Sequence, residues 1–199
     1  GIFNRQACKD MAPERRDTDH EFGTNPCSEI VLRSAQFCNL TEVVVRPEDN
    51  LDMLKVKIEA ATILGTLQSG LTDFRFLRKV WKNNCEEERL LGVSLTGLWD
   101  RLDPLTEDDL CQLRTHAINV NADYSKRLKI NPSTAITCVK PSGTVSQLVN
   151  SASGCHPRHS KFYIRRVRND IKDPLAKVMI DAGIPYEVDN HNSETYVFE

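Results

Sequence analysis

The sequence lacks any long apolar run. No stretch of its 199 residues approaches the roughly 18 consecutive apolar residues that span a membrane. The opening residues 1–5, Gly-Ile-Phe-Asn-Arg, also lack the apolar segment of a secretory signal. These absences indicate a cytoplasmic protein with no membrane partner.

The chain also lacks an excess of charge of one sign. Lysine and arginine number 26 against 28 aspartates and glutamates, a formal net charge of -2. A global basic field, which would drive nonspecific nucleic-acid binding, is therefore missing. A basic stretch at residues 156–168 is interleaved with Phe162 and Tyr163, but a strand would place its charges on different faces. We expect a small-molecule partner and no nucleic acid.

Paired metal-binding cysteines are missing as well. No Cys-x-x-Cys occurs and the histidines lack a set of partner ligands, so we expect no metal site. The seven cysteines are odd in number and irregularly spaced, which argues against a secreted disulfide framework. With 40% hydrophobic residues the chain can bury one core, in which most thiols, Cys138 and Cys155 among them, are expected to be structural.

The two ends of the sequence suggest that the chain is a fragment of a longer protein. The chain has no initiator methionine, and residues 196–199 alternate like a strand cut in the middle. We expect residues 1–199 to be one partial domain.

Apolar spacing, capping residues and helix breakers predict the secondary structure. Helices are predicted over residues 51–67, 74–83, 106–128, 142–149 and 174–182. Strands are predicted at residues 27–32, 39–45, 90–96, 134–139, 186–188 and 196–199, and residues 9–24 are expected to run from a helix end into a loop. The alternation of strands with helices predicts an α/β fold with mostly parallel pairing.

Three chemically useful side chains, Asn25, Cys27 and Glu29, occupy alternate positions. Pro26 favours extended geometry for the residue before it, and an extended backbone points alternate side chains to one face, about 7 Å apart. An amide, a thiol and a carboxylate would then converge on one cavity, with Cys38 nearby. The same short pattern also fits a surface loop in which Cys27 only packs.

A second candidate site lies between the predicted strand that ends at Lys140 and the next predicted helix. Small and hydroxylic residues at a helix N-terminus can bind phosphate through free amides and the helix dipole. The spacing is not that of a P-loop, and a simple helix cap is the alternative. The candidate substrate-binding residues are Pro141, Ser142, Gly143, Thr144, Val145 and Ser146.

A series of short segments resembles, in order, the catalytic subunits of ribonucleotide reductases. The segments are residues 3–5, 13–16, 25–30, 36–40, 64–68, 85–94 and 141–144. The proline after Asn25 and the short interval between Cys27 and Cys38 resemble the monomeric, adenosylcobalamin-dependent class (class II). The resemblance covers nearly the whole chain.

The resemblance implies a role for each residue of the active-site loop. Cys27 matches the cysteine that becomes a thiyl radical and removes the 3'-hydrogen of the ribose. Glu29 matches the base toward the 3'-hydroxyl, Asn25 the amide that orients the ribose hydroxyls, and Cys38 one half of the reducing dithiol. The partner of Cys38 has no match here and is expected upstream.

The same resemblance implies the fold and the partners. The fold would be the second half of a ten-stranded α/β barrel with the Cys27 loop at its centre. The cofactor would be adenosylcobalamin, bound at a site that is incomplete in this chain, which alone is expected to be inactive. The partners would be a ribonucleoside di- or triphosphate, thioredoxin or a similar dithiol, and a deoxynucleotide effector.

Three other functions remain open from the sequence. One is a reductase of class I type, whose radical comes from a separate subunit. Another is a cysteine hydrolase in which His20, His156 or His159 activates Cys27. The third is a noncatalytic nucleotide-binding module that uses only the loop at residues 141–146.

Overall fold

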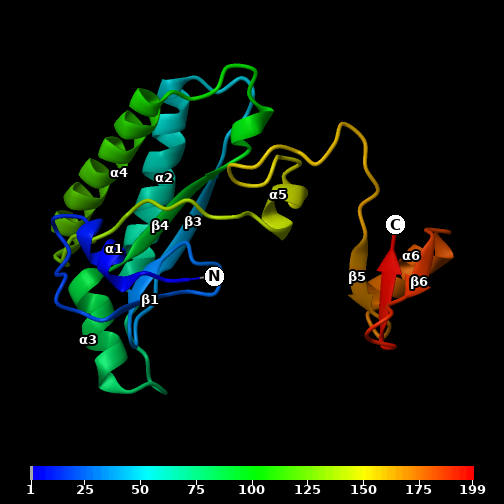
Figure 1. Cartoon of the computed structure of the whole chain (residues 1–199), viewed down its shortest axis with the longest axis horizontal. Helices are drawn as coiled ribbons and strands as arrows, with labels where there is room; N and C mark the ends of the chain where they lie inside the picture. Colours follow the sequence, from blue (N-terminus) through cyan, green and yellow to red (C-terminus); the bar gives the residue numbers. More distant parts are fainter. Residues whose placement is uncertain (1) are drawn as a thin grey trace. The chain divides into compact units, whose positions relative to one another are not determined.

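The computed structural model describes residues 2–199, which divide into two compact units. The first unit ends at Arg158 and the second comprises residues 159–199. Figure 1 shows the course of the chain through each unit. Among residues 2–199, no helix combines the length and the apolar content needed to cross a membrane.

A parallel pair of strands forms the centre of the first unit. β3 (Asn39–Val44) runs beside β4 (Leu91–Thr96), with Asn39 opposite Leu91. α2 (Leu51–Ser69) lies on the connection between the two strands, and α4 (Glu107–Leu128) packs beside α2 (Figure 1). The buried core is formed by apolar residues of all four elements, including Val43, Leu54, Leu91 and Ala117. This arrangement confirms the predicted α/β fold.

Local sequence signals set the ends of the two long helices. The side chain of Asn50 accepts a hydrogen bond from the amide of Met53, and Gly70 ends α2. Thr106 and Asp109 form a reciprocal capping box that begins α4. The helices predicted at residues 51–67 and 106–128 are confirmed, as are the strands predicted at residues 39–45 and 90–96.

Short elements surround this centre. α1 (Arg5–Asp10) precedes a hairpin made of β1 (Phe22–Thr24) and β2 (Val31–Arg33), which pair antiparallel. α3 (Lys79–Glu88) leads into β4, and a short 3₁₀ helix (Leu98–Asp100) follows it. α5 (Thr144–Leu148) is a single short turn of helix near the end of the unit.

The second unit is a small sheet with one helix. β5 (Val167–Asp170), β7 (Thr195–Phe198) and β6 (Tyr186–Val188) are antiparallel, with β7 in the middle. Ala176 of α6 (Pro174–Asp181) and Val197 and Phe198 of β7 are buried. The predicted helix at residues 174–182 and the predicted strands at residues 186–188 and 196–199 are confirmed, whereas β5 was not predicted.

Several predicted elements are wrong or displaced. The helix predicted at residues 74–83 begins only at Lys79 and runs to Glu88, because Phe74 lies in a turn where its ring meets that of Phe37 edge-on at 5.3 Å. The strand predicted at residues 27–32 begins only at Val31, and β1 occupies part of the predicted loop. The helix predicted at residues 142–149 is limited to α5.

The strand predicted at residues 134–139 is reduced to one parallel bridge, between Val93 and Thr137. The amides of Leu91 and Val93 donate to Ala135 and Ile136 respectively, so β4 advances two residues while its neighbour advances one. The ladder is therefore irregular. Mostly parallel pairing is also wrong, since the hairpin and the sheet of the second unit are antiparallel.

Candidate active site

The segment that contains Cys27 forms the tip of the β1–β2 hairpin. The amide of Ser28 donates to the carbonyl of Asn25 at 3.0 Å, and the amide of Ile30 donates to the Asn25 side-chain oxygen at 3.1 Å. Ser28 adopts a left-handed conformation with φ of 62°. The predicted extended backbone is therefore wrong, because Asn25 and Pro26 favour a tight turn that satisfies its own backbone groups.

This turn separates the three side chains that an extended strand would align. Cys27 is exposed at the tip, while Glu29 is partly buried. One carboxylate oxygen of Glu29, Oε2, is buried and has no hydrogen-bond partner among the described residues. Glu29 lines a cavity of about 370 Å³, and neither Asn25 nor Cys27 is among its lining residues. The convergence of all three on one cavity is thus not found in this chain.

Cys38 lies immediately before β3, in the same region as Glu29. Burial, followed by the neighbouring Cys138 and Glu29, raises the pKa of the Cys38 thiol to about 12. Burial and Glu29 also raise the pKa of Cys138, to about 11. Both thiols therefore stay protonated at neutral pH. The predicted proximity of Cys38 to Glu29 is supported, and Cys138 is a neighbour that the sequence did not reveal.

The base of the hairpin is held by a buried ion pair. The guanidinium of Arg16 donates to both oxygens of Glu88, at the end of α3, with each distance 3.0 Å. Arg16 also donates to the carbonyl of Val31 at 2.8 Å, and its charge lies 4.5 Å from the centre of the Phe22 ring. A single side chain therefore contacts both strands of the hairpin and the helix beneath them.

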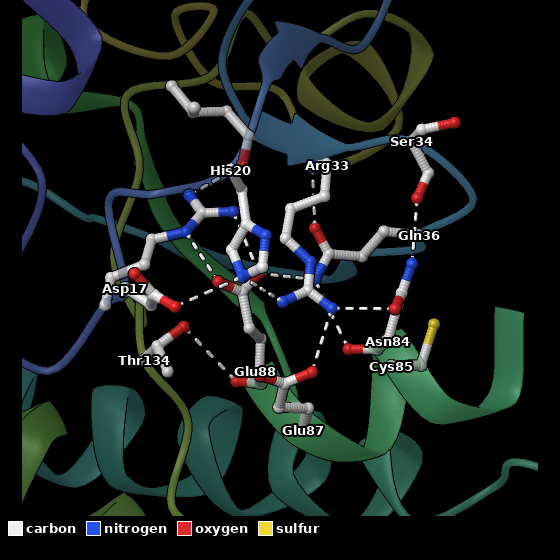
Figure 2. Close-up of polar contacts among 12 residues, drawn as sticks. Asp17, His20, Arg33, Ser34, Gln36, Asn84, Cys85, Glu87, Glu88 and Thr134 are labelled. Atoms are coloured by element: carbon white, nitrogen blue, oxygen red, sulfur yellow. Dashed lines mark hydrogen bonds and ion pairs between the residues drawn. The ribbon is translucent and has the colours of Figure 1, made fainter. Parts of the chain in front are cut away.

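Arg33, on β2, makes a second set of contacts to α3. It donates to Asn84 at 2.7 Å and to Glu87 at 3.0 Å, and its guanidinium lies 2.7 Å from Nε2 of His20 (Figure 2). Gln36 accepts from the amide of Arg33 and donates to Glu88, which joins the two sets. The sequence did not reveal these contacts, because Arg33 and Asn84 lie 51 positions apart and polar side chains are ordinarily solvated.

The candidate phosphate loop follows the segment that forms a single bridge to β4 at Thr137. Thr137 lines the Glu29 cavity, and the loop begins four residues later, at Pro141. Ser142 and Ser146 are buried and Gly143 through Val145 are exposed around the start of α5. The hydroxyl of Ser146 donates to the carbonyl of Gly143 at 2.8 Å, so it is committed within the loop. The exposed amides and Thr144 are the groups left for a ligand.

Some charged side chains elsewhere are also paired. Arg158 donates to Asp100 at 2.9 Å, and Arg168 donates to Asp189 at 2.7 Å. Burial disfavours the Asp100 carboxylate, but hydrogen bonds from Arg158 and the amide of Ala152 outweigh it and lower the Asp100 pKa. Within residues 2–199, no group of three or more His, Cys, Asp or Glu side chains is arranged to hold a metal ion.

Comparison with known proteins shows which proteins the chain is similar to. No family model matches the chain. It is 29% identical over 208 residues to the adenosylcobalamin-dependent ribonucleoside-triphosphate reductase of Lactobacillus leichmannii, covering 89% of this chain and 28% of that protein. A probable reductase of the same name from Dictyostelium discoideum is 31% identical, covering 100% of this chain and 26% of that protein.

A solved structure agrees with the sequence matches. The crystal structure of a B-12 dependent (class II) ribonucleotide reductase superposes with a TM-score of 0.67 and 25% identity, covering 96% of this chain and 29% of that one. The chain spans less than a third of the length of these relatives. The resemblance inferred from the sequence motifs is confirmed: the chain is similar, over nearly its whole length, to a segment of the adenosylcobalamin-dependent ribonucleotide reductases.

Proposed function

We propose that this chain is the part of a ribonucleotide reductase that carries the radical cysteine, and that the whole protein converts ribonucleotides to 2'-deoxyribonucleotides. The observation that carries this proposal is the joint match of sequence and fold to class II reductases. The unpartnered, buried oxygen of Glu29 supports it from the geometry, because a carboxylate without a hydrogen-bond partner is suited to receive one from a ligand.

In the proposed mechanism Cys27 acts as a thiyl radical. It takes the 3'-hydrogen of the ribose, and Glu29 accepts the proton of the 3'-hydroxyl. The 2'-hydroxyl leaves as water, and a dithiol that includes Cys38 supplies two electrons and becomes a disulfide. Cys27 then returns the hydrogen to C3'. The net reaction converts one ribonucleotide and one dithiol into a deoxyribonucleotide, a disulfide and water.

Asn25 keeps the group needed for its proposed role. Its side-chain oxygen accepts from the amide of Ile30, so its side-chain NH₂ is the group that would donate toward a ribose hydroxyl. The bond that fixes the turn therefore also fixes the direction of the donor.

We propose that other parts of the protein complete the site around the hairpin. A thiyl radical needs shelter from water, and Cys27 is exposed in this chain. Closure of the ten-stranded barrel, of which this chain would be much of the second half, would supply that shelter. The substrate would be a ribonucleoside di- or triphosphate held at residues 141–146, thioredoxin or a similar dithiol the reductant, and a deoxynucleotide the effector.

The described residues do not fit adenosylcobalamin on their own. The cavity beside Glu29 lacks Cys27 among its lining residues, so a cofactor seated there would not face the thiol. We therefore assign the cofactor chiefly to parts of the protein outside residues 1–199. We also propose a cytoplasmic location, as expected from the sequence.

The geometry weakens the hydrolase alternative in which His20 is the base. A hydrolase needs a histidine free to take the proton of Cys27, yet the ring of His20 lies against Arg33 at the base of the β1–β2 hairpin. A noncatalytic nucleotide-binding module would keep the loop at residues 141–146 and have no use for the buried, unpartnered oxygen of Glu29.

The test uses the protein encoded by the full reading frame that contains this sequence. With a ribonucleoside triphosphate, adenosylcobalamin and a dithiol, we expect deoxynucleotide only when all three are present. Cys27→Ser should abolish its formation, whereas Cys111→Ser, which changes an exposed thiol on α4, should leave it intact. Deoxynucleotide formed without the cofactor, when a separate radical subunit is added, would favour class I. No deoxynucleotide under either condition would reject the proposal.

A further inference from the structure

Glu42 is a nearly buried carboxylate that joins the Cys38 strand to the candidate phosphate loop. It lies on β3, four residues beyond Cys38, and its side chain is 11% exposed. One oxygen, Oε1, accepts the hydroxyl hydrogen of Ser142. The other, Oε2, accepts from Nζ of Lys140 at 3.1 Å. Both partners belong to the segment that leads into α5, far along the chain.

The bond to Glu42 decides what Ser142 can do. A serine hydroxyl has one hydrogen, and here it points to Glu42, so it is not available to a phosphate. The Ser142 oxygen instead accepts from the amide of Ser146 at 3.1 Å. Ser153 accepts from the Ser142 amide at 3.2 Å and donates to the Ser142 carbonyl. The hydrogen bonds to Glu42, Ser146 and Ser153 therefore fix the position of Ser142 in the loop.

The three loop residues that follow Ser142 are exposed to solvent. Gly143, Thr144 and Val145 are exposed, and amides in the first turn of a helix have no acceptor within that helix. The charge of Glu42 would repel a phosphate if it stood alone, but Lys140, whose side chain is 23% exposed, is paired with it. The Glu42–Lys140 pair thus shapes the loop without adding net negative charge.

We propose that Glu42 is a positioning residue for the substrate: through Ser142 it holds the loop in the conformation that presents its amides to the nucleotide phosphates. This inference rests on the proposed function of the loop. It also links two parts of the proposed site. Strand β3, which begins directly after Cys38, carries Glu42, and Glu42 in turn holds the phosphate loop through Ser142.

The test compares Glu42 variants of the full-length protein in steady-state reduction and in equilibrium dialysis with a ribonucleoside triphosphate. Glu42→Ala should raise both the KM and the dialysis Kd at least tenfold and change kcat less than about threefold, because the loss concerns binding and not the chemical step. Glu42→Gln keeps an acceptor for Ser142 and should show a smaller rise. Glu48→Gln, an exposed change of the same charge, is the matched control.

A second comparison tests whether Glu42 acts through Ser142. In a Ser142→Ala background, adding Glu42→Ala should raise the KM less than twofold further, because the contact is already lost. Unchanged KM and Kd in both Glu42 variants, or the same tenfold rise in both backgrounds, would overturn the inference. If Glu42→Ala does not fold, Glu42→Gln tests the same inference, with a smaller expected rise in KM and Kd.

The two proposals can fail separately. Wild-type protein that binds the nucleotide and does not reduce it would reject the proposed function, and the dialysis comparison would still judge Glu42. Wild-type protein that reduces the nucleotide, with Glu42→Ala equal to it in KM and Kd, would reject the inference alone. Wild-type protein that binds no nucleotide would reject both.

Discussion

The β3–β4 centre and the β1–β2 hairpin are held in place by different forces. The centre buries apolar side chains such as Val43, Leu54 and Leu91 against two long helices. The hairpin is attached through arginines, with Arg16 bound to Glu88 and Arg33 bound to Asn84 and Glu87. Apolar burial is nondirectional, whereas these charged contacts fix angles as well as distances. The hairpin is thus oriented at its base while Cys27 stays exposed at its tip.

The largest expected difference is in thiol reactivity. Because burial raises the pKa of Cys38 to about 12, only about one part in ten thousand of it is thiolate at pH 8. Iodoacetamide at that pH should label the exposed Cys27 much faster than Cys38, as followed by mass spectrometry of peptides. Labelling of Cys38 should rise tenfold per pH unit as the pH approaches 12. Equal rates for the two thiols at pH 8 would contradict the described burial.

Removal of Arg16 should be the most damaging single change to the hairpin. Arg16→Met leaves Glu88 charged and buried, and breaking such a pair costs about 3–5 kcal/mol. Hydrogen exchange of the Arg33 amide, which is bonded to Gln36, should accelerate accordingly. The double variant Arg16→Met with Glu88→Leu should recover part of the loss, because no unpaired charge remains.

The matched control for Arg16 is an exposed pair of the same chemistry. Arg75 contacts Asp73 with both side chains more than 70% exposed, so Arg75→Met should change the protection of the Arg33 amide by less than about 1 kcal/mol. Protection that is unaltered in Arg16→Met would mean that apolar contacts, and not the ion pair, hold the hairpin.

A cavity in the centre should have a slightly smaller effect, spread over the first unit. Leu54 is fully buried between α2 and the strands, and Leu54→Ala should lower the free energy of unfolding by about 2–5 kcal/mol. Val56→Ala, on the exposed face of the same helix, serves as control and should have little effect. Urea unfolding followed by circular dichroism measures both. Similar losses of unfolding free energy in the two variants would show that Leu54 is not a core residue.

The smallest expected effect is at the start of α4. Thr106→Ala removes the side-chain cap and should cost about 0.5–2 kcal/mol in the same urea assay. Hydrogen bonds from the backbone and side chain of Thr106 lower the pKa of Asp109. A lowered pKa stabilises the fold above the unfolded-state value and loses that contribution as the pH falls toward the folded-state value. Thr106→Ala should therefore be less acid-sensitive than wild type as the pH falls below about 4, the unfolded-state pKa of an aspartate.

The sequence predicted the apolar framework well because periodicity and capping are local signals. Leu54 and Ile58 lie one helical turn apart, and Thr106 with Asp109 identifies the start of α4 without any tertiary contact. The irregular ladder beside β4 could not be seen in this way, since the alternation around Thr137 is the same in a regular strand.

The conformation of the candidate site was missed. Asn25 followed by Pro26 is a signal for a turn, but the alternation of Asn25, Cys27 and Glu29 favoured a strand. The pairing of Arg16 with Glu88 joins residues 72 positions apart, and neither residue carries a sign of burial in its local sequence. Long-range polar contacts such as Glu42 with Ser142 are hidden for the same reason.

The central proposal is that Cys27 starts the reaction and that Cys38 supplies electrons to it. The most direct measurement is product analysis of the full-length protein after one incubation with ribonucleoside triphosphate, adenosylcobalamin and dithiol. Cys27→Ser should give no product, because the serine O–H bond is too strong for a hydrogen to be removed usefully. Cys38→Ser should still lose the 3'-hydrogen of the substrate and release free base in place of deoxynucleotide. Deoxynucleotide from Cys27→Ser, or normal deoxynucleotide without base release from Cys38→Ser, would contradict the account.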